Sequence, residues 1–318
     1  MGVLGELARR CAFGDLAALA RAGVAPAEIL GTCEFGKQLL ELDAEDFGDA
    51  DPSVPGALVE RARQIRMPQE PRESVRGALA SMRPAYALLL EVIAIRWARR
   101  EMAGLVAAAH IASEYLHVLA WEPVLGHGAD PARLGERMAV PGSRFGIVAE
   151  AEHCEHTRGV RAACDRSLRV SKEPGEGWRA YLDRQHSQMA KGLGVCAAEC
   201  RTPCTPVTGL PERVRIALAD RNHLAREFAD GALVKLRHAA PVGHGFGVPS
   251  QEELQDAWAR SRTSLSKHAL FHAAPDPDPD FPLKGLPQAF TAVAAAKIAP
   301  STLLHDVSLH LQTLLPDD

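Results

Sequence analysis

The stretch PAYALLLEVIAIRWARREMAGLVAAAHIASEYLHVLAW, residues 84–121, decides the fold class. Its apolar residues show no strand-like alternation with polar ones, and helical periodicity runs through the whole stretch. It starts at Pro84 and stops just before Pro123, a residue that cannot continue a helix. We therefore predict one long helix over residues 84–121, and this helix would open the main body of an all-α protein.

The segments on either side of this stretch also have helical rather than strand periodicity. Residues 1–70 look like short helices broken by glycine and proline, and residues 67–74 read as a linker. After Pro123, further helices are expected at 146–168, 177–200 and 211–238. Ser250 and Glu253 have the spacing of a capping box, which predicts another helix ending near residue 268.

The C-terminal part reads as a linker followed by a last helix. Proline and aspartate alternate within residues 273–287, which predicts a stiff connection. The apolar stripe of the final helix would dock onto the body of the protein or onto another protein; it consists of Leu304, Val307, Leu311 and Leu314. We predict an irregular helical bundle in three parts: an N-terminal helical module at 1–70, a central bundle at 76–272, and a C-terminal tail helix within 288–318.

Composition and charge narrow the class of protein. A chain of 318 residues with 47% hydrophobic residues can bury an ordinary core, which aliphatic residues and alanine must fill because aromatics make up only 5%. The net charge of −4 offers no positive field for nucleic acid or anionic membranes. No signal peptide is recognisable, and seven cysteines then read as reduced thiols. We expect a soluble, cytoplasmic protein with neither nucleic-acid nor membrane partners.

Four times an acidic residue precedes a histidine by three positions. Residues three apart share one helix face, and helix bundles use this spacing to aim a carboxylate and an imidazole at one metal ion. Thirteen histidines would produce one or two such pairs by chance, so four is a mild excess. The pairs are Glu114/His117, Glu150/His153, Asp183/His186 and Asp220/His223.

Two places have the strongest metal-type pattern. His110, Glu114 and His117 form an i, i+4, i+7 row, although the same face leads back to arginines and also fits a solvated surface. His186 lies on a regular apolar stripe with Asp183 at its margin. A buried imidazole needs a hydrogen-bond partner or a metal, so His186 is either a structural histidine or a ligand.

The remaining pairs favour exposed surfaces. Glu150 and His153 have polar neighbours in every direction, and Asp220 and His223 lie opposite an apolar stripe. Converging pairs would resemble the di-metal carboxylate site of ferritin-like bundles, but the short Glu-x-x-His motif assigns no family. The candidate ligands for non-haem iron or zinc are His110, Glu114, His117, Glu150, His153, Asp183 and His186.

A cysteine run raises a separate possibility. Cys196, Cys200 and Cys204 are spaced Cys-x3-Cys-x3-Cys, whereas zinc sites usually use Cys-x2-Cys. Cys196 and Cys200 continue the stripe of His186, so they read either as packing thiols or as ligands of a metal or iron–sulfur cluster.

Two functional hypotheses follow from these patterns. The chain has no nucleotide-binding loop, no nucleophile elbow and no His-Glu-x-x-His motif. The first hypothesis is a helical adaptor or scaffold that binds protein partners. The alternative is a metal-dependent enzyme, such as a non-haem iron oxygenase, with a buried histidine and carboxylate site in the bundle.

Overall fold

A computed structural model describes residues 2–43, 50–65, 80–126, 128, 194, 197, 209–238, 240 and 245–315. All regular elements over these residues are helices, and the same residues contain no strand. The predicted all-α fold is confirmed. The elements are α1 (Val3–Arg9), α2 (Phe13–Arg21), η1 (Ala27–Ile29), α3 (Leu30–Glu41), α4 (Gly56–Arg63), α5 (Arg83–Ala98), α6 (Met102–Leu125), α11 (Glu212–Ala229), α12 (Ala232–Lys235), η3 (Leu236–His238), α13 (Gln251–Leu265), α14 (Ala269–Ala273), α15 (Leu286–Ala294) and α16 (Leu303–Leu314).

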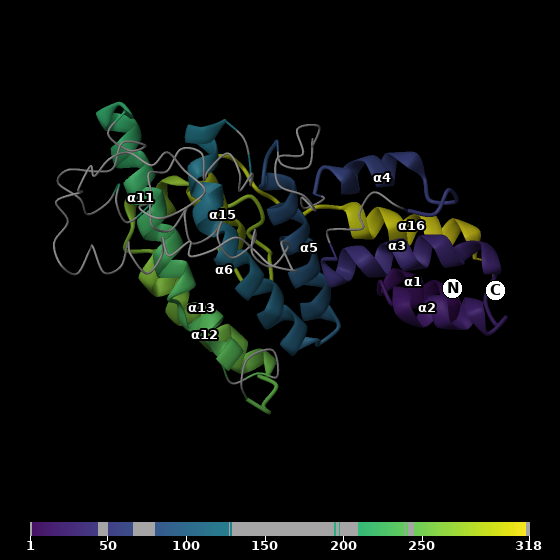
Figure 1. The fold of residues 1–318 in the computed structure, drawn as a ribbon. Coiled ribbons are helices and arrows are strands. Elements are labelled where there is room, and N and C mark those ends of the chain that lie inside the picture. Colours follow the sequence, from purple (N-terminus) through teal and green to yellow (C-terminus); the bar gives the residue numbers. More distant parts are fainter. Residues whose placement is uncertain are drawn as a thin grey trace, which may run out of the picture.

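The stretch predicted as one long helix forms two helices, α5 and α6, which pack side by side (Figure 1). The prediction of a continuous helix was wrong because the chain turns at Arg99–Glu101, where Arg100 adopts a left-handed conformation with φ of 61°. No glycine or proline marks this turn. A tertiary contact accompanies it, since Nη1 of Arg99 donates a hydrogen bond to the Cys11 carbonyl at 2.8 Å.

Helix α6 lies in the middle of the core and packs against α5, α11 and α15. Aromatic rings join these elements: Phe290 of α15 meets Tyr86 at 4.9 Å and Phe228 at 5.5 Å between ring centroids, both edge-on. The Tyr86 hydroxyl donates a hydrogen bond to the Ala112 carbonyl at 2.6 Å, so the polar atom of this buried ring has a partner. Three aromatic rings thus meet in this central packing layer.

The described residues contain one segment, Met102–Val124 of α6, that is long and apolar enough to cross a membrane. Its most apolar window has a mean hydropathy of 1.3, and 61% of that window is buried inside the protein. Buried core helices of soluble proteins also reach this length and hydropathy.

The last helix, α16, docks within its own chain. It packs against α1, α3 and α4 of the N-terminal module, which comprises α1, α2, η1, α3 and α4, and it also touches α5 (Figure 1). The Ser308 hydroxyl donates to the Ala8 carbonyl at 2.7 Å, and Arg61 pairs with Asp306 at 2.5 Å. The apolar stripe faces this interface; its buried residues are Leu303, Leu304, Val307 and Leu311. Of the two docking alternatives, the structure shows the one within the body.

Two buried glutamates cap helices to which they do not belong. Glu122 of α6 accepts a hydrogen bond from the Met82 amide at the start of α5, at 2.7 Å. Glu91 of α5 accepts one from the His305 amide in the first turn of α16, at 2.9 Å. Side-chain oxygens that accept hydrogen bonds suit these places because the first amides of a helix have no partner within it. The caps connect α6 to α5, and α5 to α16.

The C-terminal half of the core follows some sequence signals and departs from others. The capping box is confirmed, because the Glu253 amide donates to Oγ of Ser250 and the Ser250 amide donates to the Glu253 carboxylate. The helix predicted over 211–238 is interrupted at Gly231. A Cβ there would lie 2.8 Å from Oγ of Ser261 and 2.9 Å from the Phe228 carbonyl, so the close approach of α13 requires glycine.

The Pro/Asp-rich segment is anchored to the core at its end. It forms no long helix, as predicted, but Phe281 and Leu283 are buried. The indole of Trp258 also donates a hydrogen bond to the Lys284 carbonyl at 2.9 Å. Helix α15, which follows directly, packs on α6 and α11, while α16 packs on the N-terminal module. The last two helices therefore pack on different parts of the molecule, α15 on the central helices and α16 on the N-terminal module.

Candidate functional site

His117, one of the predicted metal ligands, joins α6 to α11. Its side chain is only 4% exposed, and Nδ1 lies 3.1 Å from Oδ1 of Asn222. Because Nδ2 of Asn222 donates to the Leu218 carbonyl, Oδ1 is an acceptor and Nδ1 of His117 is the donor. Gly194 packs closely here, since a Cβ would come within 2.2 Å of the Asn222 oxygen. The side-chain amide of Asn222 thus accepts a hydrogen bond from Nδ1 of the buried His117 ring.

His110 faces a cation. Nη1 of Arg237 lies 3.0 Å from Nδ1 of His110 and is also hydrogen-bonded to Nε2. Partial burial, followed by the charge of Arg237, lowers the pKa of His110, while Glu114 at 3.9 Å raises it less. The imidazole is thus neutral near pH 7 and accepts a hydrogen bond from the guanidinium. A ring nitrogen used in this way has no lone pair left for a metal ion.

Ser113, beside His110, is not an activated nucleophile. Its hydroxyl lies 3.5 Å from Nδ1 of His110 but donates its proton to the His110 carbonyl at 2.7 Å. A nucleophilic serine would have to donate to the imidazole instead. The bond to the main chain is the usual one for a serine inside a helix.

The row His110, Glu114 and His117 does not form a metal site by itself. His117 lies in the core, whereas the Glu114 side chain is 52% exposed. Across the described ranges, no three His, Cys, Asp or Glu side chains are close enough to hold a metal ion. The other predicted ligands lie outside the described residues; they are Glu150, His153, Asp183 and His186. The run Cys196, Cys200 and Cys204 also lies outside them.

The fourth acid–histidine pair lies on α11, where Asp220 is exposed and His223 is half-buried. Sequence reasoning missed their neighbours Arg221 and Asn222, which are buried. The signal was available in principle, since both positions are close to the apolar stripe through Leu218.

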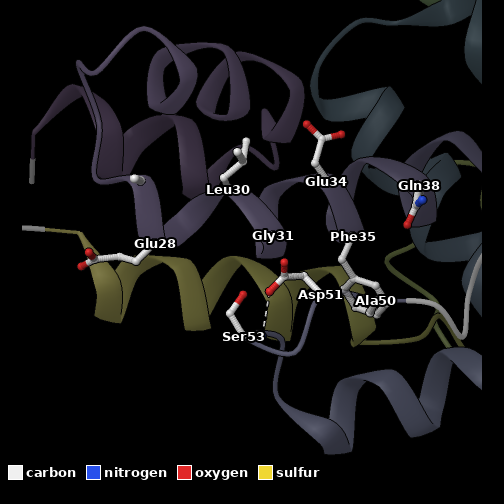
Figure 2. Close-up of a pocket in the computed structure, with 10 residues that line it drawn as sticks. Glu28, Leu30, Gly31, Glu34, Phe35, Gln38, Ala50, Asp51 and Ser53 are labelled. Atoms are coloured by element: carbon white, nitrogen blue, oxygen red, sulfur yellow. Dashed lines mark hydrogen bonds between the residues drawn. The ribbon is translucent and has the colours of Figure 1, made fainter.

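A groove of about 520 Å³ opens on the N-terminal module, between α3 and the segment that leads into α4 (Figure 2). We call it the acidic groove because the described residues of its lining include three carboxylates and no Lys, Arg or His. Glu28 comes from η1, Glu34 from α3, and Asp51 from the segment before α4. The described residues of the lining are Ala27, Glu28, Leu30, Gly31, Glu34, Phe35, Gln38, Ala50, Asp51 and Ser53.

Close packing sets the shape of the acidic groove. A Cβ on Gly31 would lie 2.7 Å from Cβ of Asp51 and 2.7 Å from Oγ of Ser53, so only glycine lets this segment approach α3 so closely. Oδ1 of Asp51 accepts a hydrogen bond from the Ser53 amide at 2.8 Å. Hydrogen bonds from the Ser53 hydroxyl and amide lower the pKa of Asp51, which keeps this carboxylate charged.

One side of the acidic groove already holds a guanidinium. Arg21, at the end of α2, forms an ion pair with Glu34, and both side chains are substantially exposed. Glu28 and Asp51 are exposed to solvent as well. Asp51 is the last residue of an acidic stretch at residues 41–51. Its meeting with Glu28 and Glu34 was not visible in the sequence, because it depends on the packing at Gly31.

The described lining of the acidic groove offers carboxylates, one amide and one hydroxyl, with Leu30 and Phe35 as apolar surface. Among these described residues there is no histidine, cysteine or lysine. Comparison of the chain with models of known protein families, with curated proteins and with solved structures finds no match.

Proposed function

We propose that this protein is a cytoplasmic helical adaptor that binds a partner protein, and that the acidic groove receives a basic segment of that partner. One observation carries the proposal: a groove of about 520 Å³ gathers Glu28, Glu34 and Asp51, and the described residues of its lining include no cationic side chain. A volume of this size accommodates a few side chains of a bound ligand. The lining would attract lysine or arginine.

The pair between Arg21 and Glu34 supports the choice of ligand. It shows that a guanidinium fits against the carboxylate of Glu34 in the folded protein. Arginine binds carboxylates through planar, paired hydrogen bonds, and Leu30 and Phe35 offer apolar surface for the stem of its side chain. A partner arginine would therefore compete with Arg21 or bind beside it at Glu28 and Asp51.

A peptide-binding assay tests the proposal. The probe is a fluorescein-labelled nine-residue peptide that alternates arginine with glycine or alanine, and its counterpart carries glutamate in place of arginine. Fluorescence polarisation of the full-length protein is expected to rise with the arginine peptide only. Binding should weaken between about 50 and 300 mM salt, because exposed charges are screened over roughly 10 Å or less in this range.

Two matched triple variants separate the groove from general charge. Glu28→Gln with Glu34→Gln and Asp51→Asn is expected to weaken binding at least tenfold. The control triple carries the same change in charge at carboxylates of the module that do not line the groove: Glu6→Gln, Asp15→Asn and Glu60→Gln. It should bind as the unmodified protein does. Equal loss in both triples, or equal binding of both peptides, would contradict the proposal.

A further inference from the structure

Glu91 places a buried carboxyl group at the contact between α5 and α16. The residue is 6% exposed, and Oε1 accepts a hydrogen bond from the His305 amide at 2.9 Å. Hydrogen bonding to the carboxyl group also lowers its pKa; the donors are the amides of Leu303 and Leu304 and the hydroxyl of Ser301. Oε2 is buried and has no hydrogen-bond partner among the described residues.

No basic side chain of the described residues forms an ion pair with Glu91, although titratable and charged groups lie on the neighbouring elements. From the turn between α1 and α2 comes Cys11, whose burial raises its pKa to about 12, so it stays neutral. Arg99, which follows α5, donates a hydrogen bond to the Cys11 carbonyl and pairs with Glu101 at 2.6 Å. The titratable groups of α16 are His305, Asp306 and His310, and Asp306 is paired with Arg61 of α4.

Two physical effects oppose each other at Glu91. Burial without a cation disfavours the carboxylate form, whereas the amides at the start of a helix favour it. Burial outweighs the hydrogen bonds and raises the pKa of Glu91 from 4.5 to about 7. The neutral carboxyl group, which keeps its carbonyl oxygen as acceptor for the His305 amide, is the form that fits this contact at mildly acidic pH.

We propose that Glu91 is a pH-sensitive latch for the C-terminal helix: the protonated side chain holds α16 on α5 and the N-terminal module, and ionisation loosens it. Loosening would uncover the apolar residues of α1, α3 and α4 against which α16 packs. The latch is independent of the acidic groove, whose lining contains no residue of α5 or α16.

The sign of the effect follows from the two pKa values. When α16 is released, Glu91 faces water and titrates near 4.5, whereas it titrates near 7 when the helix is docked. The stabilisation of docking is therefore complete below pH 4.5, declines as the pH rises through 7, and stays at the lower value above that.

Hydrogen–deuterium exchange of the full-length protein, followed by mass spectrometry, tests the latch. Amides of α16 are compared at pH 5.5 and pH 8 after correction for intrinsic exchange rates, with amides of α13 in the same sample as reference. The protection of α16 is expected to fall by about tenfold or more at the higher pH, as linkage to a pKa near 7 predicts, while that of α13 stays constant.

Glu91→Gln keeps the hydrogen-bond acceptor and removes the charge. In this variant the protection of α16 at pH 8 should equal its protection at pH 5.5. Glu253→Gln, which alters an exposed glutamate that caps α13, is the control and should retain the pH dependence of α16. Constant protection of α16 in the unmodified protein overturns the latch, as does an equal fall in α13. If Glu91→Gln does not fold, the profile of the unmodified protein still decides.

Discussion

At the scale of single residues, His117 shows how tertiary partners determine the role of a histidine. Its spacing to His110 and Glu114 suggested a metal ligand, but its Nδ1 donates to Asn222 on another helix. His110 in the same row accepts a hydrogen bond from Arg237. Two histidines on one face of α6 thus have different hydrogen-bond partners, because His117 lies against Asn222 of α11 and His110 lies against Arg237.

Replacing Asn222 tests whether this buried pair stabilises the fold. Asn222→Ala removes the acceptor of His117 Nδ1 and the donor to the Leu218 carbonyl, which should lower the free energy of unfolding by about 2–3 kcal/mol. Asp220→Ala, at an exposed position of the same helix, should change it by no more than about 0.5 kcal/mol. Urea denaturation with an unchanged m-value measures both; similar losses in the two variants would argue against the pair.

At the scale of helices, α16 joins the two ends of the chain. Its stripe was evident in the sequence, but the surface it covers was not. The prediction concerns two leucines of this helix. Leu311 is fully buried, so Leu311→Ala should destabilise the protein by about 2–5 kcal/mol through lost burial and a cavity.

The matched control is Leu309, which is 46% exposed on the opposite side of α16. Leu309→Ala should alter stability by less than about 0.5 kcal/mol. Thermal denaturation followed by circular dichroism compares the two variants at one pH. A larger effect at Leu309 than at Leu311 would mean that α16 docks through its other face.

Helix boundaries show where local signals suffice. The start of α13 followed from Ser250 and Glu253, because a capping box acts between residues three positions apart. The turn between α5 and α6 could not be predicted from the sequence, because arginine rarely adopts the positive φ that Arg100 has here. That turn is accompanied by the contact of Arg99 with Cys11, a residue far away in the sequence.

At the scale of the whole molecule, metal content separates the two functional hypotheses. We expect protein purified without a histidine tag to contain no iron or zinc held by the α6 row, because the guanidinium of Arg237 lies against the ring of His110 and no three potential ligands among the described residues are close enough to hold an ion. Inductively coupled plasma mass spectrometry should give the same metal content for the unmodified protein and for a His110→Gln, Glu114→Gln double variant. Stoichiometric metal lost in this variant would contradict that expectation.

His186→Ala extends the same measurement to the alternative hypothesis of a metal-dependent enzyme. His186 lies outside the described residues, so its role as a ligand stays a prediction from the apolar stripe alone. Stoichiometric iron or zinc that disappears only in His186→Ala would support the enzyme and would weigh against a purely binding role. Metal-free protein after reconstitution would favour the adaptor.

By itself, the sequence determined the helical class, the capping box of α13 and the amphipathic stripe of α16, because each depends on residues within a few turns of one another. Only the tertiary structure decided the break after Ala98, the partners of His110 and His117, the acidic groove and the burial of Glu91. These features depend on which distant segments meet: Gly31 admits Asp51, and α5 receives α16. Helical periodicity shows that a face is apolar or polar, but not what will pack against it.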